Sequence, residues 1–313
     1  MPKAARVGDF HLCLAFTPLP HVGGPIVSVC SPNVETNSRN QARSGDRLQC
    51  IPSINFIVTG SGSVEINGQL AARKTDRTMH QPLGLITAGS SNVEIGGPRV
   101  GATLGNRKKG LKACKAARVG RNPPPGATGP DGKQLLANTR GQSYNNCGVE
   151  SSRQIINQSH PGSPRTQEGL LQEAFDHGDA IRDPKGLYYS GGTYTDTMEN
   201  ILERNGVPAH LESGSMQNLA QAVAGDQGVI ATLMAGTMWP VSNPGQGAYP
   251  PPGTGGHAVL VTGVEFDADG NVKNVIINDT GTGQCGIRVP ASTFQEAVDD
   301  YNGGLVITDE PIW

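Results

Sequence analysis

An internal repeat near the N-terminus is the feature that most constrains how this chain can fold. Residues 31–50 and 61–80 align without a gap at a shift of 30 residues, and Ser, Val, Glu, Asn, Ala, Arg and Asp recur in register. Residues 5–9 are a further copy of the Ala-Arg-x-Gly-Asp unit, and residues 92–97 form a closing half-copy. Units this short cannot bury a core alone, so the copies must stack on one another.

Each copy predicts a short strand, a turn and a second strand. Residues 63–66 alternate polar and apolar side chains, and Asn67-Gly68 is a strong signal for a tight hairpin turn. Two copies depart from the repeated unit, with Ser44 in one and Lys74-Thr75 in the other. The expected fold of residues 1–98 is therefore all-β and made of stacked hairpins.

The repeat also places metal-binding side chains at equivalent positions. Cys13, Cys50 and His80 each lie four residues after the aspartate of their copy, and His11 and His21 lie nearby. A small β-rich unit with little apolar mass is stabilised by a metal clamp, and histidine with cysteine suits a tetrahedral Zn²⁺ site. The alternative is that these are surface histidines and a small core cysteine.

A family resemblance is carried by four motifs in this region. They are Pro2-x-Ala4-Ala5-Arg6, Pro20-His21-Val22-Gly23-Gly24-Pro25-Ile26, Ala71-Ala72-Arg73 and Asp76-x-Thr78-x-His80. Together they resemble a PAAR-repeat domain over about residues 1–98. The resemblance implies a sharp β-cone that caps the trimeric spike of the bacterial type VI secretion machine. It also implies zinc bound by three histidines and a cysteine near the apex. Carried over, the ligands are His11, His21, Cys50 and His80, and the repeat alignment keeps Cys13 as a competitor of His11.

Charge divides the chain into three blocks. The net charge is −2, but residues 1–100 carry +3, residues 101–140 carry +8 and residues 141–313 carry −13. With the Pro- and Gly-rich run at 123–132, this predicts domains at 1–98 and 141–313 joined by a basic linker at 99–140. The basic stretch has no interleaved aromatic residues, so we expect no nucleic acid partner. The default is a solvated linker, and docking onto the acidic block or a loading partner is the alternative.

Targeting signals and paired cysteines are both missing from the pattern. No stretch approaches the roughly 18 apolar residues needed to cross a membrane, and no apolar run precedes a small-residue cleavage site. We therefore expect a chain made in the cytoplasm and exported without a signal peptide. Its cysteines are expected to be metal ligands, nucleophiles or core residues rather than disulfides. They are at positions 13, 30, 50, 114, 147 and 285.

From residue 141 the pattern changes to helices followed by strands. A loop runs into a helix at Cys147, and further helices are predicted at 166–177, 195–205 and 215–224. Short β-branched runs then predict strands at 229–233, 257–264, 274–279 and 286–289, followed by a helix at 292–297. Helices followed by an antiparallel sheet are an α+β layout.

Three residues of this region fit a thiol mechanism. Cys147 would begin a helix, where the helix dipole and free N–H groups favour the thiolate. His257 begins a strand and Asp279 ends the next one, so the imidazole can act as base and the carboxylate can fix its tautomer. Cys285 is the competing nucleophile. His160, His177 and His210 are the alternative bases, expected to lack a partnering Asp on a neighbouring strand.

A second resemblance covers about residues 141–300. Asn146-Cys147-Gly148, Gly256-His257-Ala258-Val259 and Ile277-Asn278-Asp279, in this order, resemble a papain-like cysteine peptidase. Within that clan they are most similar to the bacteriocin-processing peptidases that cut after a Gly-Gly pair. The resemblance implies an oxyanion-hole glutamine upstream of the cysteine, usually one residue further than Gln142. Gln142 is still the candidate, with the Cys147 N–H as second donor, and Asn145 or Asn146 could replace it.

Together the two resemblances imply a type VI antibacterial effector that delivers a toxin enzyme. The expected partners are the spike trimer, a cognate immunity protein and a target-cell protein, cleaved after Gly-Gly in the recipient's cytoplasm rather than its periplasm. The alternatives are deamidase or transglutaminase chemistry on the same triad, and a spike-tip adaptor without enzymatic activity.

Overall fold

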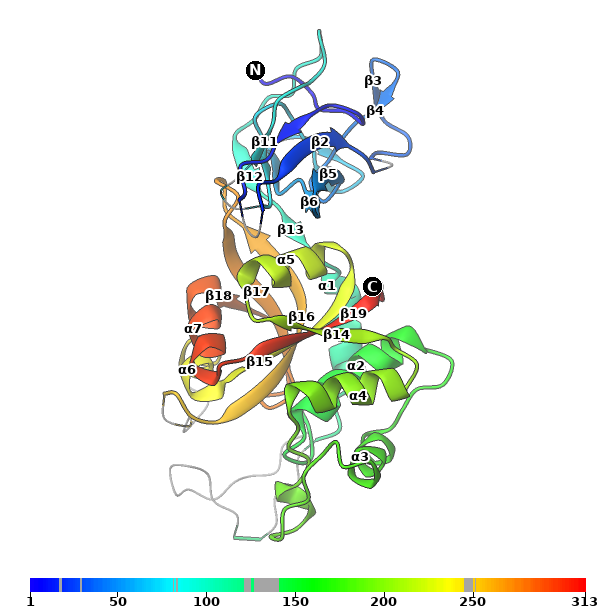
Figure 1. The fold of residues 1–313 in the computed structure, drawn as a ribbon, viewed down its shortest axis with the longest axis vertical. Helices are drawn as coiled ribbons and strands as arrows, with labels where there is room; N and C mark the ends of the chain where they lie inside the picture. Colours follow the sequence, from blue (N-terminus) through cyan, green and yellow to red (C-terminus); the bar gives the residue numbers. More distant parts are fainter. Residues whose placement is uncertain are drawn as a thin grey trace. The chain divides into compact units, whose positions relative to one another are not determined.

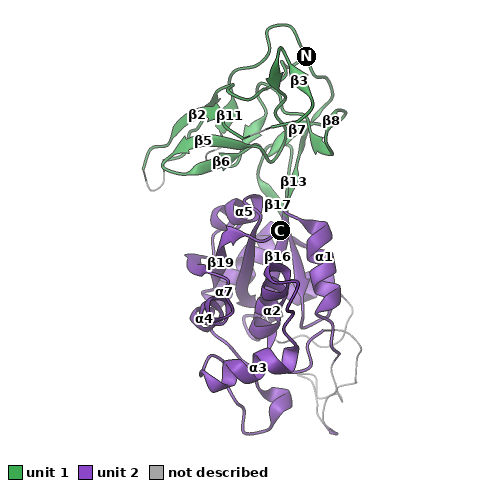
Figure 2. Cartoon of the chain, turned by 90° about the vertical axis from the view of Figure 1, so that its right-hand side faces the viewer, with its two compact units in different colours: residues 1–104, 264–273 green, residues 105–263, 274–313 purple. Residues whose placement is uncertain are grey.

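The computed structural model divides the chain into two compact units, each described here by itself. It describes residues 1–16, 19–28, 30–80, 82, 84–120, 125–126, 141–244, 250 and 252–313. Unit 1 contains Met1–Leu104 and Val264–Lys273, and unit 2 contains Gly105–Gly263 and Asn274–Trp313 (Figure 2). In the described part of the chain, no helix is both long and apolar enough to cross a membrane.

Unit 1 is built from short strands. They form two three-stranded sheets, ordered β1-β11-β10 and β2-β5-β6, and the two-stranded pairs β3-β4, β8-β9 and β7-β12, while β13 pairs with the end of β16. The strands are β1 (His11–Leu12), β2 (Val22–Ile26), β3 (Glu35–Thr36), β4 (Arg39–Asn40), β5 (Arg47–Ile51), β6 (Ile54–Phe56), β7 (Thr59–Ser61), β8 (Glu65–Ile66), β9 (Gln69–Leu70), β10 (Arg77–Thr78), β11 (Gly84–Ile86), β12 (Arg99–Gly101) and β13 (Thr103–Leu104).

The sequence repeat becomes a threefold pseudosymmetry of the backbone. Ala5 N–H donates to the carbonyl of Ala72, Ala72 N–H to that of Ala42, and Ala42 N–H to that of Ala5, at 2.9–3.0 Å. These three bonds close a ring in which each copy donates to one neighbour and accepts from the other. The copies therefore stack around a common axis, as units too small to fold alone require.

Salt bridges and core residues follow the same symmetry. In each copy the arginine N–H and guanidinium both donate to the aspartate three residues later; the pairs are Arg6–Asp9, Arg43–Asp46 and Arg73–Asp76. The three alanines of the ring are buried together with one isoleucine from each copy; those isoleucines are Ile26, Ile57 and Ile86. Buried arginine is tolerated here because its carboxylate partner and hydrogen bonds go with it.

The predicted turn at Asn67-Gly68 is present. Both residues have positive φ, 54° and 75°, and they join β8 to β9. The equivalent hairpin, β3-β4, turns through Asn37 and Ser38, which also have positive φ. The all-β fold predicted for the N-terminal region is confirmed.

Unit 2 is an α+β unit around a long antiparallel sheet (Figure 1). The sheet order is β14-β19-β15-β16-β17-β18. The strands are β14 (Ala209–Ser213), β15 (Gln227–Met234), β16 (Gly256–Phe266), β17 (Val272–Asp279), β18 (Gln284–Pro290) and β19 (Gly304–Pro311). The helices are α1 (Arg107–Ala116), α2 (Cys147–Ser159), α3 (Gln167–Asp176), α4 (Thr195–Arg204), α5 (Met216–Ala224), α6 (Ala235–Ser242) and α7 (Ala291–Tyr301), with a 3₁₀ turn at Leu187–Tyr189.

Helix α2 is the central helix of this unit. Nine of its thirteen residues are buried, and it packs against α1, α3, α4 and strand β15. Helices α6 and α7 pack on one another and lie together in Figure 1, apart from α2, α3 and α4. Because α2 packs on β15, and β15 pairs with β16, the N-terminal end of α2 lies near the start of β16.

The α+β class predicted for the C-terminal region is confirmed, and four elements were not anticipated. Strands β14 and β19 and helix α6 lie in stretches where the sequence predicts no helix or strand. Helix α1 lies in the stretch expected to be a linker and belongs to unit 2. The Pro- and Gly-rich run at 123–132 lies outside the described residues, apart from 125–126.

Candidate functional site

Unit 1 brings two cysteines and two histidines together. The ligand atoms of Cys13, His21, Cys50 and His80 all lie within 4.8 Å of one another. Cys13, Cys50 and His80 occupy the equivalent position of the three copies, so the threefold stacking makes them converge. His21 comes from the longer β1–β2 connection, which only the first copy has.

The spacing of these atoms fits a tetrahedral metal ion. The two His Nδ1 atoms are 3.1 Å apart, and the four S···Nδ1 distances are 3.4–3.7 Å. Around Zn²⁺, with Zn–S about 2.3 Å and Zn–N about 2.05 Å, tetrahedral ligand atoms lie about 3.3–3.8 Å apart. Nε2 of His80 lies 3.4 Å from Ser53 Oγ, an outer hydrogen bond that orients a ligating imidazole.

His11, one of the four ligands expected from the family resemblance, is not in this group. Its side chain is buried, and its Nδ1 lies 3.0 Å from the carbonyl oxygen of Gly24. It is close enough to His80 for its charge to lower the pKa of that residue. Cys13, the competitor indicated by the repeat alignment, stands in the cluster instead.

Within the cluster, each side chain disfavours the charged form of its neighbours. Burial and the neighbouring Cys13 raise the pKa of Cys50 to about 12. Burial and the charge of His21 lower the pKa of His80 to about 4. The imidazole is thus kept in the neutral form that a metal requires, and a divalent cation would supply the positive charge that favours thiolate ligands.

In unit 2, Cys147 is the first residue of α2. Asn146 precedes it in a non-helical conformation, so the helix begins at the thiol. Gly148 allows the close packing of this end, because a Cβ there would lie 2.0 Å from Oγ1 of Thr193 and 2.6 Å from Sδ of Met198. The Cys147 residue is half-buried, and its thiol is held at the first turn of the helix.

His257 lies at the start of β16 and Asp279 at the end of β17. Nε2 of His257 is 2.8 Å from Oδ1 of Asp279, and the Asp279 side chain is fully buried. This leaves Nδ1 of His257 for the hydrogen bond that the imidazole makes with the Cys147 sulfur. The structure therefore brings the three residues expected to be catalytic into one hydrogen-bonded chain.

The electrostatics favour an ion pair between thiol and imidazole. Burial raises the pKa of Cys147, but His257 and the backbone hydrogen bonds of Ala258 and Gly148 outweigh it, and the pKa lies below its ordinary value. Burial lowers the pKa of His257, yet Asp279 and Cys147 raise it well above its ordinary value. Both shifts favour a thiolate beside an imidazolium, the pair that makes a thiol nucleophilic.

Gln142 is held beside the end of β17. Its N–H donates to the carbonyl of Thr280, its Oε1 accepts from the Thr280 hydroxyl, and its Nε2 donates to the carbonyl of Tyr144. An amide nitrogen has two N–H groups, and the described part of the chain shows a partner for one of them, so the other could serve an oxyanion. Of the two alternatives, Asn145 is exposed, while the buried Asn146 lies 3.4 Å from Gln167 Oε1 through its Nδ2.

Several neighbours of the three residues were not predicted from the sequence. Trp239 on α6 donates to Oδ2 of Asp279, and Gly281 N–H donates to its Oδ1. Tyr301 on α7 lies close enough to Cys147 for that charge to contribute, after burial, to a raised Tyr301 pKa. Tryptophan is rare in this chain, which has only two, but rarity alone is a weak indication of a role at the site. No sequence spacing links Trp239 to Asp279.

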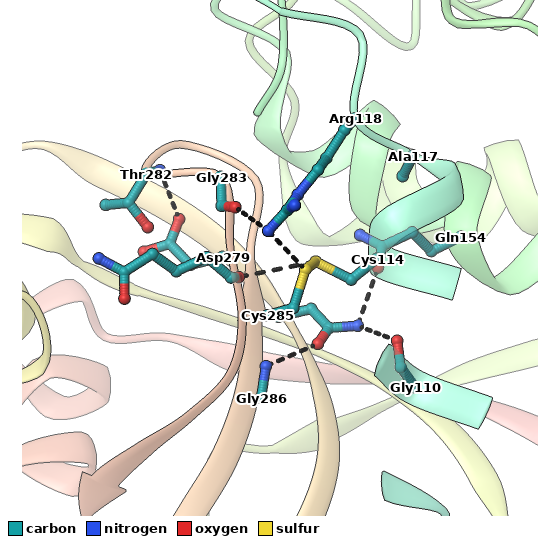
Figure 3. The surroundings of a disulfide bond; sticks show 12 residues. Gly110, Cys114, Ala117, Arg118, Gln154, Asp279, Thr282, Gly283, Cys285 and Gly286 are labelled. Carbon is teal, nitrogen blue, oxygen red and sulfur yellow. Dashed lines mark hydrogen bonds between the residues drawn. A yellow bond between two sulfur atoms is a disulfide. The ribbon is translucent and has the colours of Figure 1, made fainter. Parts of the chain in front are cut away.

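Two of the other expectations are wrong. Cys285 is not a free thiol, because it forms a disulfide with Cys114, 171 residues away, that joins α1 to β18 (Figure 3). His210 does have a partnering aspartate, since its Nδ1 lies 2.6 Å from Oδ1 of Asp309 on the neighbouring strand. That pair is exposed on the strands β14 and β19, unlike the buried pair beside Cys147. The remaining candidate bases, His160 and His177, cap the C-terminal ends of α2 and α3.

Comparison with known proteins assigns the N-terminal region. Residues 17–83 match the family described as PAAR motif, so this part of the chain carries that motif, as predicted. No curated protein matches the chain. One similar solved structure is a C39-like peptidase from Bacillus anthracis, with 16% identity and a TM-score of 0.38, covering 53% of this chain and 90% of the other. That likeness is too distant to bear on function.

Proposed function

We propose that this chain is an effector of the bacterial type VI secretion machine, in which unit 1 is the spike tip and unit 2 is a cysteine peptidase. The observation that carries the enzymatic part is the buried hydrogen-bonded set of Cys147, His257 and Asp279. A thiol at a helix start, with a base fixed by a buried carboxylate, is the arrangement that nucleophilic catalysis requires.

In the proposed reaction, the Cys147 thiolate attacks the carbonyl carbon of the scissile peptide bond. The oxyanion is stabilised by Gln142 Nε2–H and the backbone N–H of Cys147. The His257 imidazolium gives its proton to the leaving amine, and the C–N bond breaks to leave a thioester on Cys147. His257 then takes a proton from water, hydroxide attacks the thioester, and the carboxylic acid product leaves. Asp279 holds His257 throughout.

The spike-tip role is supported by the PAAR motif and by the threefold pseudosymmetry of unit 1. A trimer presents three identical surfaces around its axis, and a single chain can match them only if it repeats its own surface three times. The ring of Ala5, Ala42 and Ala72 gives the chain that repetition. Zinc is the metal proposed for Cys13, His21, Cys50 and His80, because two thiolates and two imidazoles at tetrahedral spacing are its usual ligands.

The substrate proposed is a protein of the recipient cell, cleaved after a Gly-Gly pair, as the sequence resemblance implies. A cognate immunity protein would protect the producing cell. For the compartment of action, the disulfide between Cys114 and Cys285 favours the periplasm over the cytoplasm expected from the sequence. Disulfides persist in oxidising compartments and are reduced in the cytoplasm.

The test is expression of the full chain in a bacterial host, directed either to the cytoplasm or to the periplasm. We expect growth arrest when the chain is directed to the periplasm, and we expect Cys147→Ala and His257→Ala to abolish it. His177→Ala is the matched control, since that histidine is exposed at the end of α3.

Host proteins captured by Cys147→Ala and then treated with the active chain should yield two fragments by mass spectrometry. A modified but uncut protein would instead indicate deamidation or transglutamination, and unchanged toxicity of Cys147→Ala would refute the enzyme.

A further inference from the structure

The side chain of Trp239 meets the catalytic set at Asp279. Oδ1 of Asp279 accepts from His257 Nε2, from Gly281 N–H at 2.9 Å and from Thr282 N–H at 3.2 Å. Within the described chain, Oδ2 accepts one hydrogen bond, from Trp239 Nε1 at 2.7 Å. A fully buried carboxylate left with an unpaired oxygen would be costly, so this indole N–H completes its coordination.

The Trp239 ring also packs edge-on against the imidazole. Its centroid lies 5.3 Å from that of His257, with the two planes at 64°. A Cβ on Gly281 would lie 3.0 Å from Cε1 of His257, 3.0 Å from Cζ2 of Trp239 and 3.2 Å from Oδ1 of Asp279. Any side chain at residue 281 would therefore press on all three groups, which explains why glycine occupies this position.

Helix α6 holds the indole in place from outside the sheet. The N–H groups of Ala235 and Gly236 donate to the carbonyls of Gly255 and Thr254, just before His257. Thr237 Oγ1 donates to Asp300 on α7. The element that carries Trp239 is thus fastened both to the start of β16 and to α7.

We propose that Trp239 is a positioning residue that fixes Asp279, and through it the orientation and basicity of His257; this rests on the proposed function of the Cys147–His257–Asp279 set. Without the indole N–H, the carboxylate charge is less stabilised and its plane is free to turn away from the imidazole. When Asp279 stabilises the imidazolium less, the thiolate–imidazolium pair exists over a narrower pH range. The thiolate is then protonated at a higher pH, and the imidazolium loses its proton at a lower pH.

The experiment measures the rate at which iodoacetamide alkylates Cys147 in the full chain as a function of pH, with that thiol quantified by peptide mass spectrometry. No substrate is needed. We expect Trp239→Phe, which keeps an aromatic ring but removes the N–H, to move the acid limb of the profile up by about one pH unit. The alkylation rate on that limb would fall about tenfold. Trp313→Phe is the matched control, because it makes the same change at the only other tryptophan of the sequence, and its profile should overlay that of the unmodified chain.

A double-mutant cycle separates positioning from a general structural effect. In the Asp279→Asn background, Trp239→Phe should change the profile by less than about twofold, because its route of action is already lost. An additive effect, or an equal loss of rate at every pH, would overturn the proposal, as would a Trp239→Phe profile that matches the Trp313→Phe profile. If the unmodified chain itself reacts like an ordinary thiol, the proposed function fails and this inference fails with it.

A second measurement leaves Trp239 intact and so does not depend on how Trp239→Phe folds. In Trp313→Phe, the remaining fluorescence comes from Trp239, beside the imidazole. It should titrate with the same midpoint as Cys147 alkylation and lose that transition in Asp279→Asn. A fluorescence that does not follow the alkylation profile would contradict the coupling between Trp239 and the pair.

Discussion

The two units build their sites in opposite ways. In unit 1 three of the four clustered ligands, Cys13, Cys50 and His80, occupy one position of a repeat, and the threefold stacking brings them to the same point. In unit 2, Cys147, His257 and Asp279 come from unrelated segments and meet only because β16, β17 and α2 pack together. Residues at equivalent positions of a repeat can be expected to meet from the sequence alone. Residues of a site assembled from distant, unrelated segments cannot.

The units also differ in what holds them together. The main core cluster of unit 1 has only eight buried residues, chiefly three alanines and three isoleucines, and it is supported by Arg–Asp pairs such as the buried Arg73–Asp76. Unit 2 has a larger apolar cluster that joins three helices to its sheet, together with a disulfide. With little apolar burial, we expect unit 1 to depend on a bound metal, whereas we expect unit 2 to fold on packing alone. The four predictions below test this contrast.

The largest expected effect is on the metal centre. Cys13→Ser should abolish stoichiometric zinc in the purified full chain and unfold unit 1, because structural zinc sites contribute about 10–16 kcal/mol of apparent binding energy. His11→Ala should keep about one zinc per chain. Elemental analysis measures the metal. Both tryptophans lie in unit 2, so their fluorescence shows whether that unit is unaffected, as the contrast requires.

The reverse result would restore the ligand set carried over from the family. If His11→Ala loses zinc while Cys13→Ser retains it, the cluster of Cys13, His21, Cys50 and His80 is not the metal site. If both variants retain zinc and stability, unit 1 does not depend on its metal and the contrast between the units is broken.

The next effect is on catalysis in unit 2. His257→Ala should lower the rate of target cleavage by a factor on the order of 10⁶, since both base and acid are lost, and Asp279→Ala by about 10⁴, since only orientation is lost. Both variants should bind zinc normally. Initial rates on the captured target measure the difference. Equal losses would mean that Asp279 does more than orient the imidazole.

The disulfide gives the third effect, on the stability of unit 2. Replacing Cys114 and Cys285 by serine opens a loop of 171 residues, for which the entropic cost of closure predicts a loss of about 3–5 kcal/mol. Urea unfolding followed by tryptophan fluorescence measures it. Asn278 donates hydrogen bonds to the carbonyl of Gly110 on α1 and to Oε1 of Gln154 on α2, and these should keep the fold at low denaturant. No change in the midpoint would show that the cross-link adds nothing to packing.

The fold classes were predicted from the sequence, as was the meeting of Cys147, His257 and Asp279, and the features that were missed have physical causes. The register of the repeat pointed to Cys13, yet the family carry-over placed His11 among the ligands. The thiol, base and acid could be predicted because helix and strand ends place them. Trp239 and the disulfide could not, because each joins segments with no pattern in common, and both depend on how α6 and α1 dock on the sheet. Helix α1 lies in the block of positive charge beside the Pro- and Gly-rich run, and that composition predicts a linker rather than a helix.

The smallest effect tests the symmetry of unit 1 itself. The equivalent positions Gly8, Gly45 and Thr75 have φ of 80°, 86° and 76°, and each N–H donates to the isoleucine carbonyl of its copy at 2.8 Å. These hydrogen bonds hold Thr75, a β-branched and exposed residue, in the left-handed region at a cost of about 1–3 kcal/mol.

Thr75→Gly relieves that cost but adds about 0.5–1 kcal/mol of backbone entropy to the cost of folding, so we expect a net gain in stability of about 1 kcal/mol. Thr75→Asn should gain a similar amount, because asparagine tolerates this conformation. Thr103→Gly, at an exposed strand position, is the control and should lose stability. Release of zinc on heating reports the unfolding of unit 1. Should Thr75→Gly release zinc at a lower temperature than the unmodified chain, the third copy does not obey the backbone geometry of the other two.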